Sequence, residues 1–353
     1  MIKSRIFSAP LVCLFCVFFV LTFSVHLQAQ LIAESTCLGE MQAIVQKESR
    51  TLEAQYSLDD PQSGKVREFN ESRVHIGQNG RAAIILHGYA ASPFEVNAIS
   101  EVFQELGYTT LQPLIHGFGS SVGLANSSNS KQWKESVVAA IQAVGHCVKS
   151  LSLVGFSLGG TLISDLVLND PNMSPEGIYK LPNGGSVQIE KIVLASPFFQ
   201  LGIHIPPFIV EILQTLIPSL DAKSMYRNTK IADLEAISRF PQFYNSIMPL
   251  TTARNVLKYG DDILDHTKGV SKIPVLLAYS DSDITISKEQ ASKFVSDHFE
   301  KSETFVIAKE FKVPHQFLIL DLNPQLPIFF EKMKTFLTAL TPGAFESFDV
   351  DAD

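Results

Sequence analysis

Short apolar runs alternate with longer helical stretches along the chain from residue 81 onward. The apolar runs have the length and composition of strands buried on both faces of a sheet, and they lie at residues 82–86, 151–156 and 191–195. A further strand is expected near residues 109–114. The stretches with helical character lie between them, at residues 94–106, 131–147 and 158–168. This alternation predicts an α/β fold, with a mostly parallel sheet and helices on both of its faces.

The same alternation returns near the end of the chain. Its strands and helices are expected at residues 273–279, 287–299, 304–308 and 325–337. The segment between the two halves has no strand signals and has helical character. We therefore expect one α/β domain at residues 81–340, with a helical cap inserted at about residues 202–272.

An apolar stripe at helical spacing marks the first part of the expected cap. Its members are Ile209, Leu213, Leu216 and Leu220. Polar residues, Glu211 among them, fall on the other face of such a helix. The stripe fits either a lid over an acyl-binding pocket or a helix that buries its apolar face on the core, and both interpretations stay open.

The first residues of the chain have the pattern of a targeting segment. Lys3 and Arg5 precede an apolar run at residues 9–25, and Ala29 offers a small residue for cleavage. Residues 1–29 therefore predict a secretory signal peptide, and hence a secreted or periplasmic protein. Because the run reaches the lower length limit of a spanning helix, an uncleaved N-terminal membrane anchor is the alternative. Both place the folded domain outside the cytoplasm.

The remaining terminal regions are polar. Residues 30–80 are expected to form an N-terminal extension, and residues 341–353 an acidic tail. Without the targeting segment, Cys37 and Cys147 are the cysteines left in the chain. In an oxidising compartment such a pair is a candidate disulfide, although two buried free thiols are an equal alternative.

Composition narrows the classes of function. The 353 residues are 46% hydrophobic and 18% charged, which is ample for a buried core. A formal net charge of −8 argues against a nucleic-acid partner. The sequence has no cluster of metal ligands and no dinucleotide or phosphate loop, so we expect no metal and no cofactor.

One short motif indicates nucleophilic catalysis. Gly155-Phe156-Ser157-Leu158-Gly159 stands directly between an expected strand and an expected helix. This strand-turn-helix context is what a nucleophile elbow requires, because the turn is strained and only glycine fits its closest approaches. The pattern also arises by chance, but the context makes Ser157 the candidate nucleophile.

A serine nucleophile needs a base and an acid from later in the chain. His298 falls at the end of an expected helix, whereas His315 falls in the loop after the strand at 304–308. Loops at the carboxyl ends of parallel strands carry the chemistry of such sheets, so His315 is the expected base. Asp281 and Asp283 both follow the strand at 273–279, and residue-level reasoning does not separate them.

The tetrahedral intermediate needs two N–H donors. The backbone N–H of Leu158, directly after the nucleophile, is the first candidate, and that of Tyr89, in the loop after the first core strand, is the second. We expect the side chain of His87 to fix this loop by hydrogen bonding and not to transfer protons.

Together these residues resemble the carboxylesterase and monoacylglycerol-lipase-like branch of the α/β-hydrolases. The resemblance rests on the motif at Ser157, on His87-Gly88-Tyr89, on the Asp283 loop and on His315, and it extends to His116-Gly117 and Trp133. It covers residues 81–337 apart from the cap. Ile115 departs from the family, which tends to have Gly there, and Tyr279-Ser280 replaces the commoner His-Gly.

The resemblance implies the α/β-hydrolase fold and a serine hydrolase with a catalytic triad. It implies Ser157 as nucleophile, His315 as base, and Tyr89 and Leu158 as oxyanion donors. Among the two aspartates it favours Asp283, since the family's acid stands four residues before a position that Ser287 occupies here.

The expected activity is hydrolysis of a carboxylic ester with an apolar acyl group through an acyl-enzyme. A lysophospholipase or a thioesterase would use the same triad, and a non-catalytic binding protein on the same fold is the alternative from another class. The expected partner is a small-molecule or lipid-like ester, with no nucleic acid. Membrane attachment is expected only through an uncleaved N-terminal segment.

Overall fold

The computed structural model describes residues 36–39, 42, 70–120, 122–182, 184–203, 219–245 and 247–339. Four predicted features lie wholly or mostly outside these ranges: the targeting segment, the extension at 30–80, the stripe of the cap and the acidic tail. No described helix is both long enough and apolar enough to cross a membrane.

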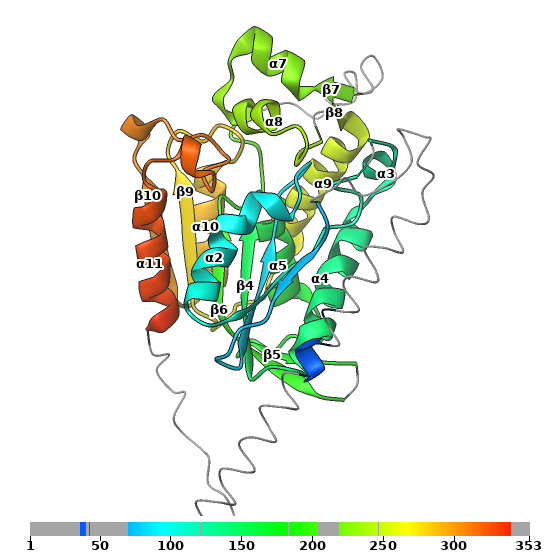
Figure 1. Ribbon diagram of the computed structural model, residues 1–353, viewed down its shortest axis with the longest axis vertical. Coiled ribbons are helices and arrows are strands. Elements are labelled where there is room, and N and C mark those ends of the chain that lie inside the picture. Colours follow the sequence, from blue (N-terminus) through cyan, green and yellow to red (C-terminus); the bar gives the residue numbers. More distant parts are fainter. Residues whose placement is uncertain are drawn as a thin grey trace, which may run out of the picture.

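An eight-stranded sheet forms the centre of the molecule (Figure 1). Its strands are β1 (Arg73–His75), β2 (Arg81–Leu86), β3 (Thr109–Gln112), β4 (Ser150–Phe156), β5 (Ile178–Lys180), β6 (Ser186–Ala195), β9 (Val275–Ser280) and β10 (Ser302–Ile307). The order is β1-β3-β2-β4-β6-β9-β10, with β5 paired to β6. Only β1 and β5 are antiparallel to their neighbours, so the mostly parallel sheet predicted from the sequence is confirmed.

Helices cover both faces of this sheet. They are α2 (Asn97–Glu105), α3 (Val122–Ser127), α4 (Ser130–Gly145), α5 (Leu158–Asn169), α9 (Leu250–His266), α10 (Lys288–His298) and α11 (Leu326–Thr338), with short 3₁₀ turns η1 (Pro93–Val96), η3 (Lys309–Phe311) and η4 (Leu320–Leu322). Successive strand residues face opposite sides. Thus Ile84 joins the buried cluster under α4, α5, α9 and α10, and Ile85 joins the cluster under α2 and α11.

The insertion over the sheet contains strands as well as helices. Its elements are β7 (Ser219–Asp221), α7 (Ala222–Thr229), η2 (Ala232–Leu234), α8 (Glu235–Arg239) and β8 (Ile247–Pro249). The strands β7 and β8 pair antiparallel, which corrects the prediction of a purely helical cap. Three-residue strands that pair only with each other leave almost no alternating pattern to read.

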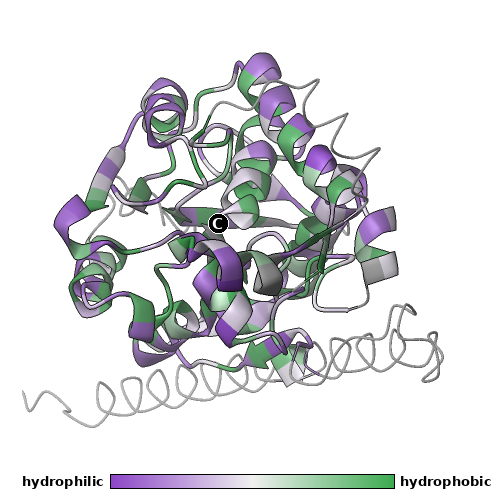
Figure 2. Ribbon diagram, turned by 90° about the horizontal axis from the view of Figure 1, so that it is seen from above, coloured by the Kyte–Doolittle hydropathy of each residue, from purple (hydrophilic) through white to green (hydrophobic). Residues whose placement is uncertain are grey.

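Helix α9 lies within the predicted bounds of the insertion, at about residues 202–272, and buries Val256, Tyr259 and Ile263 in the same cluster as α4 and α5. Figure 1 accordingly shows α7, α8, β7 and β8 above the sheet and α9 running down beside it. Seen from above, hydrophobic segments gather inside and hydrophilic ones lie mostly on the outer helices (Figure 2).

The sheet begins before the predicted start of the domain at residue 81. Strand β1 pairs with β3 at the edge, Arg73 opposite Gln112. Its residues are polar or half-exposed, as an edge strand allows, so no apolar run marks it. Farther toward the N-terminus, a disulfide joins Cys37 to Cys147, at the end of α4, with 5.8 Å between the Cα atoms.

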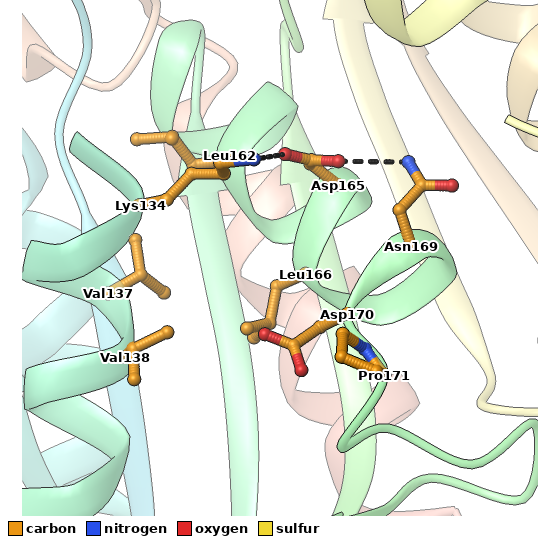
Figure 3. A pocket seen from close by; sticks show the side chains of 9 residues that line it. All are labelled: Lys134, Val137, Val138, Leu162, Asp165, Leu166, Asn169, Asp170 and Pro171. Atoms are coloured by element: carbon orange, nitrogen blue, oxygen red, sulfur yellow. Dashed lines mark hydrogen bonds and ion pairs between the residues drawn. The ribbon is translucent and has the colours of Figure 1, made fainter. Parts of the chain in front are cut away.

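A groove lies between α4 and α5 (Figure 3). Asp165, one of its lining residues, accepts hydrogen bonds from Tyr259 Oη at 2.8 Å and Asn169 Nδ2 at 2.9 Å and pairs with Lys134 at 3.2 Å. Because every donor comes from α4, α5 or α9, this network joins the three helices to one another. The groove contains none of the predicted catalytic residues.

Candidate active site

Ser157 stands at the sharp turn between β4 and α5. Its φ of 51° and ψ of −119° lie outside the regions that L-residues favour. A Cβ on Gly155 would lie 2.4 Å from the carbonyl carbon of Gly159, and one on Gly159 would lie 2.6 Å from Leu86 O. Both distances are impossible contacts, so the glycines of the motif are required by the turn that presents Ser157.

His315 lies between Ser157 and Asp283, in the loop between η3 and η4. Its Nε2 is 2.9 Å from Ser157 Oγ, and its Nδ1 is 2.7 Å from Asp283 Oδ2. Asp283 follows β9, and its Oδ1 accepts hydrogen bonds from the backbone N–H groups of Thr285 and Ile286. Three side chains that are far apart in the sequence thus form one continuous hydrogen-bonded line, and all three are buried.

Asp281 and His298, the other candidates for acid and base, make hydrogen bonds away from Ser157. Asp281 is exposed, and its carbonyl oxygen accepts a hydrogen bond from Lys288 Nζ at 2.6 Å. His298 donates from Nδ1 to the carbonyl of Gly269 at 2.8 Å. The geometry therefore separates Asp283 from Asp281, which the residues alone left open.

The loop after β2 passes directly against Ser157. A Cβ on Gly88 would lie 3.0 Å from Ser157 Cβ, and Tyr89 follows in the chain. Leu158 begins α5, so its backbone N–H belongs to the first turn, whose N–H groups have no partner within the helix. Leu158 is thus the chain neighbour of Ser157, and Tyr89 is the chain neighbour of Gly88, which packs against Ser157.

His87 holds this loop with both ring nitrogens. Its Nε2 accepts from the backbone N–H of Ile115 at 3.0 Å, and its Nδ1 donates to the carbonyl of Gly88 at 2.9 Å. Burial lowers the pKa of His87 to about 4, so the ring stays neutral. These bonds match the expectation that the side chain of His87 fixes the loop.

A buried glutamate beside the nucleophile was missed from the sequence. Glu95 in η1 accepts a hydrogen bond on Oε2 from Gly88 N at 2.8 Å. Burial raises its pKa to about 7, although the Gly88 N–H, the charge of His315 and the hydroxyl of Tyr244 act in the opposite direction. The signal available in the sequence was an acidic residue within an otherwise apolar stretch, Pro93-Phe94-Glu95-Val96.

A second missed carboxylate belongs to the insertion. Asp233 in η2 accepts hydrogen bonds from the backbone of the His315 loop and from the Asp283 loop. Burial by itself lowers the pKa of His315, but the charges of Asp283, Asp233 and Glu95 and the hydrogen bond to Asp283 outweigh it, so that the pKa is raised.

The described residues bring together one set of metal-binding side chains. Cys37, His146 and Cys147 offer ligand atoms within 4.8 Å of one another. Since the two sulfurs are bonded to each other, neither is available as a thiolate.

Comparison with protein families shows to which family the chain belongs. The model of the Hydrolase_4 family, described as serine aminopeptidase S33, matches residues 77–318. The chain belongs to this family. The match includes the turn at Ser157, the Asp283 loop and the His315 loop, and so covers the whole hydrogen-bonded line.

Relatives with known names match only in part. A thermostable monoacylglycerol lipase from Bacillus sp. (strain H-257) is 25% identical over 97 residues, or 27% of this chain. The chain matches 23% and 39% of the length of the two curated relatives found.

Solved structures show the fold, which is the α/β-hydrolase fold. A monoglyceride lipase from Saccharomyces cerevisiae has a TM-score of 0.58 at 14% identity, covering 80% of this chain and 94% of its own. The monoacylglycerol lipase from Paleococcus ferrophilus has a TM-score of 0.56 at 17% identity, covering 75% and 97%. The predicted fold class is thereby confirmed.

Proposed function

We propose that the protein hydrolyses carboxylic esters through an acyl-enzyme on Ser157. The observation that carries this proposal is the line Asp283 Oδ2, His315 Nδ1, His315 Nε2 and Ser157 Oγ, with distances of 2.7 and 2.9 Å. A serine hydroxyl becomes nucleophilic when a base at this distance accepts its proton. The strained turn at Ser157 supports the same role, because such strain occurs where a side chain must be presented.

In the first step, Ser157 Oγ attacks the ester carbonyl carbon while His315 Nε2 accepts the hydroxyl proton. The negative charge on the carbonyl oxygen is stabilised by the backbone N–H groups of Leu158 and Tyr89. His315 then donates the proton to the departing alcohol, leaving an acyl group on Ser157. Water repeats the sequence, with His315 as base, and releases the acid. Asp283 holds the imidazole tautomer and stabilises the imidazolium.

The substrate class rests on the relatives and on the insertion. Monoacylglycerol lipases recur among the similar proteins, which favours a monoacylglycerol or another ester with an apolar acyl group. Around the site, Ala91, Ala236, Ile237 and Tyr244 form a buried apolar cluster between the insertion and the loop after β2. A lysophospholipase or a thioesterase remains the alternative, since the same atoms would act on another leaving group.

The family description raises aminopeptidase activity as a competing function. An aminopeptidase binds the ammonium group of its substrate, which favours a carboxylate with free acceptor capacity facing the site. Among the described residues, the buried carboxylates around His315 all accept hydrogen bonds from N–H or O–H groups of the protein. An ionised carboxylate has about four acceptor sites, so these bonds do not exclude an ammonium group, and the preference for esters rests on the similar lipases.

We further propose that the protein works outside the cytoplasm. The disulfide between Cys37 and Cys147 supports this, because such bonds persist in oxidising compartments. N-terminal sequencing of the protein recovered from the cell exterior tests it together with the predicted cleavage near Ala29. Recovery only from the cytosol, with both thiols free, would refute it.

A fluorophosphonate probe tests the catalytic proposal directly. The wild type should be labelled on Ser157, and Ser157→Ala should not. Initial rates on p-nitrophenyl esters of increasing acyl length, compared with aminoacyl p-nitroanilides, then separate esterase from aminopeptidase. Absence of labelling in a folded wild type would support a non-catalytic binding protein and contradict the proposal.

A further inference from the structure

Asp233 is an acidic residue buried beside the proposed catalytic groups but absent from the triad. Its side chain lies in η2 of the insertion and is 5% exposed. A carboxylate without partners at this depth would be strongly destabilising, so its hydrogen bonds indicate what it does.

One carboxylate joins two loops of the core. Asp233 Oδ1 accepts a hydrogen bond from His315 N at 2.9 Å. Its Oδ2 accepts from Thr285 Oγ1 at 2.7 Å and from Ile284 N at 3.2 Å. The first partner is the proposed base itself, and the other two directly follow Asp283. The insertion thus holds the loops of the base and of the acid against each other.

The side chain of Asp233 also acts through its charge. The groups that influence the imidazole of His315 come from three elements: Asp283 after β9, Asp233 in η2 and Glu95 in η1. The negative charge of Asp233 favours the imidazolium, which is the form that develops as Ser157 Oγ loses its proton.

We propose that Asp233 is a positioning residue for the acid–base pair, and that through it the insertion sets the geometry of Asp283 and His315. It does not touch the reacting atoms. Its two oxygens fix the backbone on either side of the Nδ1–Oδ2 hydrogen bond, so displacement of η2 would move the base relative to the acid. The inference rests on the proposed function in so far as His315 acts as the base of Ser157.

The isosteric change Asp233→Asn tests the proposal with the least disturbance of packing. An amide has one acceptor oxygen, so its NH₂ group must face either the His315 N–H or the donors of residues 284 and 285. We expect kcat to fall about a hundredfold, as for misplacement of a catalytic group by about 1 Å. KM should change little, because the interaction is not with substrate.

The pH profile separates positioning from a merely structural role. With one negative charge removed, the acidic limb of kcat/KM, which follows protonation of His315, should move to lower pH. In the resting protein, the NMR titration of His315 should shift in the same direction, and the resonance of its Nδ1 proton should change. The variant Asp233→Ala should show both effects and also lose stability, because three donors are left without their acceptor.

Asp321→Asn is the matched control. Asp321 is an exposed aspartate that also joins the insertion to the core, through a 3.0 Å ion pair with Arg239 of α8. Its loss should leave kcat and the pH profile unchanged, since exposed ion pairs contribute little. The proposal would be overturned if both Asp233 variants kept the wild-type kcat, the wild-type acidic limb of kcat/KM and the wild-type His315 titration. It would also be overturned if Asp233→Asn lost activity while the acidic limb and the His315 titration stayed at their wild-type positions.

The test also distinguishes this inference from the proposed function. If the wild type fails to react with fluorophosphonate, the hydrolase proposal fails, but the NMR titration of His315 still reports whether Asp233 controls the imidazole. If the wild type reacts and the titration does not respond to Asp233→Asn, only the inference about Asp233 fails.

Discussion

Replacing Glu95 by glutamine should make the stability of the protein less sensitive to high pH. Burial raises the pKa of Glu95 from an ordinary 4.5 to about 7. Between these values the folded protein holds a proton on Glu95 that the unfolded chain has released, so folding stability falls as pH rises through this window. A displacement of that size corresponds to about 3 kcal/mol.

Glutamine removes the ionisation and keeps the shape. Its amide oxygen accepts from Gly88 N as Oε2 does now, and its NH₂ group can face the hydroxyl of Tyr244. Relative to wild type, Glu95→Gln should therefore gain about 2 to 3 kcal/mol between pH 5 and pH 9, because most of the window lies in this range. Urea unfolding followed by far-UV circular dichroism at pH 5, 7 and 9 measures the difference.

Glu101→Gln on the same side of the sheet is the control. Glu101 is exposed on α2, so its ionisation costs no burial, and its replacement should give no gain that grows with pH. If the stability difference between Glu95→Gln and wild type is the same at pH 5 and pH 9, the argument that burial opposes the charge of Glu95 is refuted.

Three further outcomes follow from the site and its supports. The raised pKa of His315 predicts that kcat/KM on a p-nitrophenyl ester falls as pH decreases through a midpoint above the ordinary 6.5, and a midpoint below 6.5 would contradict it. Gly159→Ala places a Cβ 2.6 Å from Leu86 O, so we expect loss of fluorophosphonate labelling and a lower Tm. A variant that is labelled and keeps the wild-type Tm would disprove the clash. Replacing Cys37 and Cys147 together by serine removes a disulfide between residues 110 positions apart, which should lower the free energy of unfolding by about 4 kcal/mol in urea. An unchanged urea midpoint would argue against that contribution.

The central sheet and the sharp turn at Ser157 could be predicted because their evidence is local. Strands such as β2 and β4 are buried on both faces and therefore appear as continuous apolar runs. The turn at Ser157 needs glycine on either side, so the motif itself records the backbone geometry. These features depend on residues that are neighbours in sequence.

The choice between Asp281 and Asp283 shows where local evidence ends. Both follow the same strand two residues apart, and either side chain suits a turn. In the fold, Asp283 N donates to Ser280 O, and the turn that results directs its carboxylate to His315, while Asp281 faces solvent. From the sequence, only the resemblance to a family favoured Asp283 over Asp281.

Glu95 and Asp233 could not be assigned from the sequence for a related reason. The partners of Asp233 lie 51, 52 and 82 residues farther along the chain, and no spacing rule links a residue of the insertion to them. The short strands β1, β7 and β8 were missed because a strand of three residues is too short to show a periodicity.

The insertion and the catalytic centre form one structural unit in this protein. Asp233 bonds to the His315 and Asp283 loops, and Asn245 N donates to Ala90 O at 2.7 Å in the loop that carries the proposed oxyanion donor Tyr89. The side chain of Tyr89 in turn donates to Pro249 O at 3.4 Å, at the end of β8. Because the insertion contacts the loops of the proposed acid and base and the loop of Tyr89 by hydrogen bonds, substitutions in it should alter kcat as well as substrate preference. A cap that only covered the substrate would alter KM alone.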